Sequence, residues 1–304
     1  MTRTEPGIRV DVIEYDGGRD VLRAVRETVF VAEQGVPLEM EWDADDPVSL
    51  HLVARDANGE PIGTVRLTPD HAIGRMAVLR PWRGRGVGDA LMAEVLRHAR
   101  LRRVPEVHLH AQVDAIGFYT RFGFVPDGPR FMEAGIEHQA MRRRLEGPTA
   151  IEGRDAAAAI CRGLIARTRR ELWIYTRALD PGLFDAPEVL DAFRRLGTRR
   201  QLVEVRVLLQ DASAAQRGRT PLIALAQRLS SVFAFREVQD PADRGYAPAY
   251  VANDTGGYYF RTLGNRFDGE ADVEGGGRAR QLADHFMPIW ERARPCTEFR
   301  ALEL

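Results

Sequence analysis

The chain turns sharply at Arg83-Gly84-Arg85-Gly86-Val87-Gly88. Before the turn stands the apolar run Met76-Ala77-Val78-Leu79, which is typical of a short buried strand. After it, residues 89–99 carry apolar side chains at helical spacing. A helix start exposes unpaired N–H groups and the positive end of the helix dipole, and glycines let that backbone approach an anion closely. The order of strand, glycine turn and helix therefore predicts a cradle for a phosphate or pyrophosphate.

Two familiar phosphate loops do not fit this turn. The P-loop ends in Lys-Ser or Lys-Thr, whereas this chain has Asp89-Ala90 at that point. The Rossmann fingerprint needs Gly-x-Gly-x-x-Gly after a first strand, whereas these glycines are spaced two apart in mid-domain. The spacing that this turn does have is Arg83-x-x-Gly86-x-Gly88, with the arginine before both glycines.

This pattern resembles the pyrophosphate loop of the GNAT superfamily, the CoA-dependent N-acyltransferases. The resemblance continues through an alternating strand at 107–112 and through the run from Ala115 to Phe124, which contains Phe118-Tyr119 and Gly123-Phe124. The chain is similar to the ElaA and YjcF branch of this superfamily at residues 29–37 and 131–141. In all, the resemblance covers residues 8–145 in the family's order.

The resemblance implies that acetyl-CoA is the acyl donor and that no metal takes part. The loop backbone would hold the pyrophosphate, with Arg83 or Arg85 pairing to it, and the preceding strand would contact the pantetheine arm. Tyr119 matches the tyrosine that protonates the departing thiolate, and Gln112 stands where many members have asparagine. The residues expected at the cofactor are Met76, Ala77, Val78, Arg83, Gly84, Arg85, Gly86, Val87, Gly88 and Gln112.

The general base is left open. Transfer to an amine needs a group that accepts a proton, and the candidates are Glu33, Glu41, Asp43 and His110. The acidic residues could equally belong to a solvated surface loop, or as a group favour a cationic acceptor such as a polyamine or lysine. His108 and His110 alternate on one strand, so we expect one of the two to face the interior of the sheet.

Length and composition set the wider limits. With 304 residues the chain is long for one core, and two domains are expected. It is 44% hydrophobic and 29% charged, with a formal net charge of −1, so bulk charge indicates neither a nucleic-acid nor a membrane partner. No apolar run approaches the ~20 residues of a membrane span. Cys161 and Cys296 stand far apart, so we expect a cytoplasmic protein with free thiols.

The first half predicts a mixed sheet with helices on both faces. Gly17-Gly18 is expected to break the first strand, and Asn58-Gly59 to form a hairpin turn. The expected strands are 8–15, 51–55, 61–67, 73–79, 107–112, 122–125 and 137–145, and the expected helices are 21–32, 89–99 and 114–121.

A linker is expected at 146–151, which divides the chain into a GNAT domain at 1–146 and a second α/β domain at 151–304. Helices and strands alternate through this second domain. The expected strands are 172–175, 203–209, 232–238, 250–252 and 258–260, and the expected helices are 154–169, 188–196, 221–229 (capped by Thr220) and 278–293.

The second half resembles one lobe of the phospholipase-D-like fold. That family's His-x-Lys-x-x-x-x-Asp signature would fall on Ala247, Ala249 and Asp254, so both the nucleophilic histidine and the lysine are absent. The resemblance therefore implies a catalytically degenerate lobe that serves in scaffolding, dimerisation or binding.

The interpretation we carry forward is an N-acetyltransferase in which a primary amine, on a small molecule or a protein, attacks the thioester directly. A backbone N–H near Val78 would hold the polarised carbonyl. The main alternative is a catalytically inactive CoA-binding sensor or scaffold whose C-terminal half binds a partner. A third makes residues 151–304 a nucleic-acid binder that delivers a substrate, although the short runs Arg142-Arg143-Arg144 and Arg199-Arg200 are typical of solvated surface.

Overall fold

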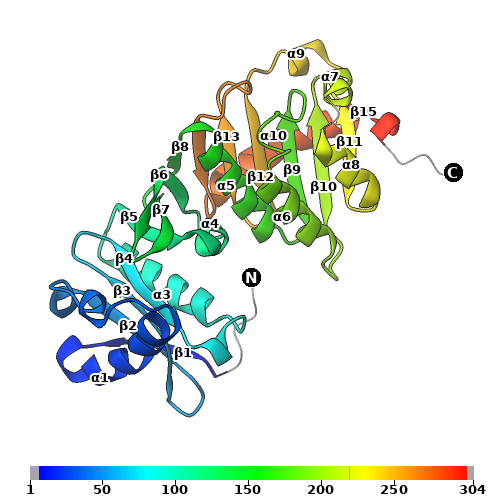
Figure 1. Ribbon diagram of the computed structural model, residues 1–304. Coiled ribbons are helices and arrows are strands. Elements are labelled where there is room, and N and C mark those ends of the chain that lie inside the picture. Colours follow the sequence, from blue (N-terminus) through cyan, green and yellow to red (C-terminus); the bar gives the residue numbers. More distant parts are fainter. Residues whose placement is uncertain (1–6, 219, 300–304) are drawn as a thin grey trace. The chain divides into compact units, whose positions relative to one another are not determined.

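The computed structural model describes residues 7–218 and 220–299, which fall into two compact units (Figure 1). The first unit comprises the chain up to residue 113 together with 127–146. The second comprises 114–126 and the chain from 147 onward. The segment 114–126 thus groups with the second unit, although the expected domain boundary lay at 146.

The first unit contains a four-stranded antiparallel sheet in chain order. Its strands are β1 (Arg9–Ile13), β2 (Leu50–Arg55), β3 (Pro61–Leu67) and β4 (Ile73–Val78). The predicted hairpin at Asn58-Gly59 is confirmed, because Gly59 adopts a φ of 87° between β2 and β3. Such a left-handed conformation favours glycine.

A second sheet of three strands, ordered β5-β7-β6, completes this part of the fold. It consists of β5 (Glu106–Gln112), β6 (Val125–Glu133) and β7 (Ile136–Arg144). The sequence predicted a mixed sheet, whereas the structure has two separate sheets here, and β4 and β5 share only a parallel bridge between Ala72 and His108. The strand predicted at 122–125 was also wrong: Gly123, at φ 83°, turns the chain, and the strand begins at Val125.

The first helix starts earlier than predicted. It comprises α1 (Tyr15–Arg26) and continues as the π-helical segment η1 (Glu27–Glu33). Gly17-Gly18 lies inside α1 rather than breaking the chain, and Gly18 is needed because a Cβ there would overlap the side chain of Ile13. The remaining helices of this unit are α2 (Leu38–Glu41), η2 (Asp46–Val48), η3 (Arg80–Trp82) and α3 (Val87–Leu101).

The second unit is built on one eight-stranded sheet in the order β15-β11-β10-β9-β12-β13-β14-β8. The strands β9 (Glu171–Thr176), β10 (Glu204–Leu209) and β11 (Phe233–Glu237) are parallel, and the others pair antiparallel. These others are β8 (Thr149–Ile151), β12 (Ala249–Asn253), β13 (Tyr258–Arg261), β14 (Gly269–Asp272) and β15 (Arg294–Pro295). Because β8 joins this sheet, the prediction that 146–151 is only a linker was wrong.

Helices cover both faces of this sheet (Figure 1). One buried cluster joins the sheet to α5 (Gly153–Arg167), α6 (Pro187–Gly197) and α8 (Pro221–Arg228), and another joins it to α10 (Gly276–Arg292). The prediction of a second α/β unit is therefore confirmed. The short elements are η4 (Val113–Ala115), α4 (Ile116–Thr120), α7 (Ala212–Arg217), α9 (Pro241–Arg244) and η5 (Thr297–Phe299). In the described residues, no helix combines the length and apolar character that crossing a membrane requires.

Candidate acyl-CoA site

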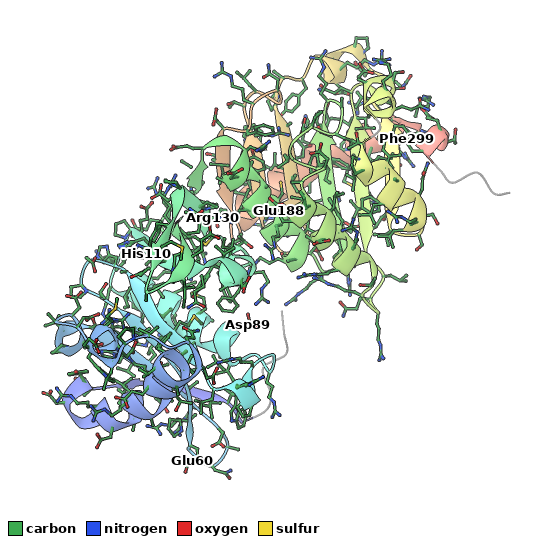
Figure 2. The ribbon with its side chains drawn as sticks, viewed as in Figure 1. Glu60, Asp89, His110, Arg130, Glu188 and Phe299 are labelled. Carbon is green, nitrogen blue, oxygen red and sulfur yellow. The ribbon has the colours of Figure 1, made fainter. Side chains whose placement is uncertain are left out.

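The glycine turn and the start of α3 form the predicted anion cradle. Gly84 and Gly86 adopt φ angles of 77° and 87°, which only glycine takes without strain. Gly86 is the N-cap of α3 and makes no side-chain cap, and the helix's hydrogen-bond ladder starts with the N–H of Ala90 donating to the carbonyl of Gly86. The preceding amides of Val87, Gly88 and Asp89 therefore stand at the positive end of a 15-residue helix, as anion binding requires. Asp89, in the first turn of this helix, is labelled in Figure 2.

The edge of β4 beside this cradle is open. Within the described chain, β4 pairs along its length only with β3, and β5 pairs only with β7. The register of β3 against β4 shifts between Thr64 and Arg66, where Arg75 takes a positive φ of 50°. Among the described residues, the side of β4 that faces β5 is paired to it only through the bridge between Ala72 and His108, and an extended chain such as pantetheine could lie in this split.

The arginines of the loop are held in different ways. Arg83 donates from Nε to the carbonyl of Val78 at 2.9 Å and from Nη2 to Oε2 of Glu33 at 2.6 Å. Arg85 lies over the ring of Trp82, with its guanidinium carbon 5.2 Å from the ring centroid. Glu33 therefore holds the predicted phosphate arginine, so it is poorly placed to act as a free base.

Gln112 identifies the face of β5 that turns toward the first helix. Its Nε2 donates to Oε1 of Gln34, the residue that caps η1, at 3.0 Å. On a strand, residues two apart share a face, so His108 and His110 point to the same side as Gln112. Both histidines are exposed, which corrects the expectation that one of them faces the interior.

His110 is paired with a carboxylate. Its Nδ1 lies 3.1 Å from Oε2 of Glu133, and its ring meets the ring of Phe131 edge-on at 4.8 Å. About half of each polar side chain is exposed. A carboxylate that accepts from Nδ1–H leaves Nε2 with a lone pair, which is the form of imidazole that takes a proton. Of the four base candidates, His110 is the one whose charged partner is a carboxylate rather than an arginine.

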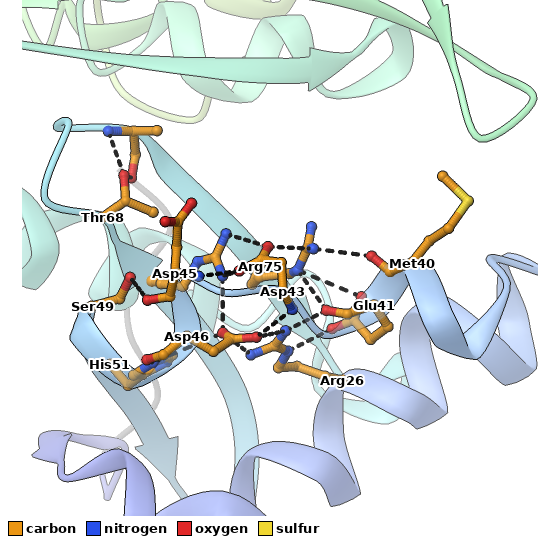
Figure 3. A network of polar contacts seen from close by, with 12 residues as sticks. Arg26, Met40, Glu41, Asp43, Asp45, Asp46, Ser49, His51, Thr68 and Arg75 are labelled. Atoms are coloured by element: carbon orange, nitrogen blue, oxygen red, sulfur yellow. Dashed lines mark hydrogen bonds and ion pairs between the residues drawn. The ribbon is translucent and has the colours of Figure 1, made fainter.

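Glu41 and Asp43 belong instead to a buried ion-pair network (Figure 3). Arg26, which is fully buried, donates from Nε to Glu41 at 2.5 Å and from Nη1 to Asp46 at 2.8 Å. Arg66 bonds Asp43 and Asp46, and Arg75 bonds Asp43 and the carbonyl of Glu41. Three arginines face three carboxylates, so the network is neutral, and its acidic members support no cationic acceptor.

The two most buried carboxyls of this network shift in opposite directions. Burial opposes ionisation of Asp46, but the hydrogen bond and charge of Arg26 outweigh it and lower its pKa to about 2. For Glu41 burial outweighs Arg26, and its pKa is raised above the usual 4.5. Burial also lowers the pKa of His51, whose Nε2 lies 2.7 Å from the carbonyl of Asp46. The network therefore acts as structural support for the loop 41–46.

Sequence reasoning missed the arginines of this network. Arg26 stands where the apolar stripe of the first helix would place another hydrophobic residue, and Arg66 lies between Val65 and Leu67 in a buried strand. An arginine inside an apolar pattern near an acid-rich loop is the signal that could have predicted these pairs, because a charge is rarely buried without a partner.

Tyr119 lies on α4, within the segment that groups with the second unit. Its ring contacts those of Phe118 and Phe124 edge-on, with centroids at 5.1 and 6.1 Å. Burial raises the pKa of Tyr119 to about 12, so the phenol keeps its proton at neutral pH. Its role as a proton donor stays a prediction.

The hairpin at 250–260 is confirmed, and Asp254 has a structural role in it. The carboxylate of Asp254 accepts from the backbone N–H groups of Arg169 and Arg170, both at 2.9 Å.

Thr220, predicted as a capping residue, makes no side-chain cap to α8. Cys161 and Cys296 are buried free thiols. Among residues 7–218 and 220–299, no cluster of His, Cys, Asp and Glu is placed to hold a metal ion.

Together, the split between β4 and β5 and the uncapped helix start beside it define an acyl-CoA N-acyltransferase fold. A family model described as an acetyltransferase (GNAT) domain matches residues 21–145. The chain belongs to the GNAT acetyltransferase family through this half. Members of this family use acetyl-CoA as the acyl donor.

Three similar proteins cover between 39% and 45% of this chain. The chain is 36% identical over 123 residues to YjcF of Bacillus subtilis, an uncharacterized N-acetyltransferase, covering 39% of this chain and 87% of the relative. It is 33% identical over 126 residues to the UPF0039 protein sll0451 of Synechocystis, covering 39% and 80%. A crystal structure of an acyl-CoA N-acyltransferase from Pseudomonas aeruginosa is 31% identical, covering 45% of this chain and 99% of that one, with a TM-score of 0.41.

The second half matches a different family model, a domain of unknown function (DUF7931), over residues 153–302. This match names no activity. The resemblance to a phospholipase-D-like lobe gains no support from it and stays a prediction.

Proposed function

We propose that the chain transfers an acetyl group from acetyl-CoA to a primary amine, on a small molecule or a protein, by direct attack of the amine on the thioester. The observation that carries this proposal is the uncapped N-terminus of α3 beside the open edge of β4. The first offers backbone donors to a pyrophosphate, and the second offers strand backbone to the pantetheine arm.

His110 is the group that we assign to the amine proton. Glu133 orients the ring through Nδ1, which leaves Nε2 as the acceptor. The lone pair of the neutral amine then attacks the carbonyl carbon, the C–S bond breaks, and the amine's surplus proton passes to Nε2. No covalent intermediate with the enzyme is needed.

The sulfur leaves as a thiolate and needs a proton. The family resemblance gives this step to Tyr119, whose phenol is protonated at neutral pH because burial raises its pKa to about 12. A protonated phenol can donate to the sulfur as negative charge develops on it, and it regains its proton from water afterwards.

Binding and turnover are tested together on the full-length chain. Acetyl-CoA is titrated in a thermal-shift assay, and free thiol release is followed with a panel of primary amines. A ligand that binds only the folded state stabilises it by about 2.7 kcal/mol at a hundredfold excess over Kd. Stabilisation with thiol release above the hydrolysis background supports the proposal.

A matched pair of variants locates the binding. Gly84 and Gly59 are both glycines with positive φ and with open space where a side chain would begin. Gly84→Glu adds a carboxylate to the cradle and should abolish stabilisation by acetyl-CoA, whereas Gly59→Glu should keep it. Stabilisation without thiol release from any amine would favour the sensor interpretation, and equal effects of the two variants would contradict the assignment of the cradle.

A further inference from the structure

The second unit holds a cavity of about 560 Å³ at one end of its sheet. Arg177 follows β9, Gln210 and Asp211 follow β10, and Glu237 ends β11, so one wall is formed where the parallel strands finish. The opposite wall is the chain leading into β12 and the chain leaving β13. In open α/β sheets, ligands bind outside the carboxyl ends of the strands, and this volume is that of a small-molecule site.

The two carboxylates at this cavity are already used within the fold. Asp211 caps α7 by accepting from the N–H of Ala214 at 2.8 Å. Glu237 accepts from the N–H of Ala212 at 3.2 Å and from Arg294 at 2.8 Å. Their negative charge is therefore largely satisfied by local donors.

The two arginines at the cavity keep donors to spare. Arg244 uses only Nε, which donates to the carbonyl of Val238 at 2.8 Å. The side chain of Arg177 is exposed and has no hydrogen bond or ion pair to any other residue in 7–218 and 220–299. The same holds for the amide of Asn265 on the opposite wall. The unused polar groups are thus cationic or neutral, and a guanidinium prefers an oxyanion.

Apart from Tyr246, the rest of the lining is small or apolar. Ala247, Pro248, Ala249 and Leu263 contribute to it, and Tyr246 adds an aromatic ring. Among the described lining residues there is no serine, cysteine, histidine or lysine. Such a surface can bind a ligand that is partly apolar.

We propose that this cavity is a binding site for a small organic oxyanion, a phosphate ester or a carboxylate, whose charge is held by Arg177 and Arg244 and whose apolar body lies against Tyr246 and Leu263. The proposal does not depend on the acetyltransferase activity of the first unit.

Three probes with one ring test it by calorimetry on the full-length chain: phenyl phosphate, benzoate and neutral benzyl alcohol. We expect at least one of the two anions to bind and the alcohol not to bind. Whichever anion binds more tightly identifies the source of the oxyanion. The double variant Arg177→Ala/Arg244→Ala should weaken binding by about tenfold or more, because each charged hydrogen bond is lost.

Two single variants serve as controls. Arg228→Ala removes an exposed arginine on α8 that does not line the cavity, and Arg83→Ala alters the loop of the first unit. Both should bind the anion as the wild type does. The proposal is overturned if neither anion binds, if the alcohol binds equally well, if the double variant retains full affinity, or if only Arg83→Ala loses it.

Discussion

Arg83 Nη2 and Glu33 Oε2 form a 2.6 Å ion pair that links the glycine turn to the end of η1. Arg83 also bonds the carbonyl of Val78, so its position is fixed at the end of β4. The pair places a carboxylate within the electrostatic field of the loop that we assign to the pyrophosphate. Because both side chains are partly exposed, the pair itself adds little to stability, and its effect should appear in ligand affinity.

Glu33→Gln is expected to tighten acetyl-CoA binding by about two- to threefold at low salt, since it removes a negative charge near an anionic ligand. Calorimetric titration at two ionic strengths measures this effect, which salt should reduce. Glu60→Gln, an exposed carboxylate in the β2–β3 hairpin, is the control and should change nothing. Weaker binding in Glu33→Gln would show instead that Glu33 positions Arg83 for the ligand.

Arg26→Met is expected to cost about 3–5 kcal/mol of folding free energy, because it leaves Glu41 and Asp46 buried without their shared partner. Arg23→Met is the matched control on the same helix. Arg23 is more than half exposed and pairs with Glu27 four residues on, so its loss should cost under about 1 kcal/mol. Chemical unfolding of both variants measures the difference. Similar losses in the two would mean that the network contributes no more than a surface pair.

The network should also make the first unit sensitive to acid. The pKa of Asp46 is lowered from 3.8 to about 2, so its stabilising effect is fully present above about pH 4 and is lost as the pH falls toward 2, an amount of about 2 kcal/mol. Glu41 has the opposite effect. Because its pKa is raised in the folded chain, its contribution to stability is fully present below pH 4.5, the usual pKa, and is lost as the pH rises through the raised pKa of the folded state.

Thermal melts between pH 2 and 5 check this expectation. The melting temperature of the wild type should fall steeply below about pH 4. Asp46→Asn should be less stable at neutral pH and show a flatter acid limb, whereas Asp45→Asn, an exposed neighbour, should follow the wild-type curve. A wild-type acid limb retained in Asp46→Asn would assign the effect to other carboxyls.

Local signals predicted most of this fold, and long-range ones failed. The turn at Asn58-Gly59 and the cradle at 83–88 depend on neighbours in sequence, so residue type alone indicates them. Gly17-Gly18 misled because the glycine at 18 leaves room for the side chain of Ile13 at the start of α1 and does not break the chain. The strand β8 was missed for a long-range reason, because these three residues pair with β14, which is more than a hundred residues away.

In the candidate site, too, features set by neighbours in sequence could be predicted, whereas those set by contacts between distant residues could not. The loop and the face of β5 could be found from spacing, whereas His110 could not be separated from Glu33, Glu41 and Asp43 until their partners were known. Glu41 is buried against Arg26, and Glu33 is bound to Arg83. The carboxylate beside His110 belongs to β6, a strand that the sequence pattern placed elsewhere.

Gly163 is expected to be intolerant of substitution because α4 lies against α5 at this point. A Cβ on Gly163 would overlap the carbonyl oxygen of Thr120, the last residue of α4. Gly163→Ala should therefore destabilise the chain by about 1–3 kcal/mol. Gly277→Ala is the control within α10: a Cβ there meets nothing within 4 Å, and alanine should stabilise the helix by about 0.5–1 kcal/mol. If α4 packs against Gly163, the melting temperature should fall in Gly163→Ala and rise in Gly277→Ala. A rise in both variants would contradict this packing.

The histidine pair on β5 offers the sharpest test of the base. His110→Gln should lower kcat by about 10²- to 10⁴-fold while leaving the KM for acetyl-CoA nearly unchanged, because general-base assistance acts in the transition state. His108→Gln is matched in strand, face and exposure, and its side chain faces Asp70 rather than Glu133, so it should retain wild-type turnover. Glu133→Gln should fall between the two, since the ring keeps its Nε2 but loses the carboxylate that orients it. Equal activity in the two histidine variants would exclude His110 as the base and leave a water chain to take the amine proton.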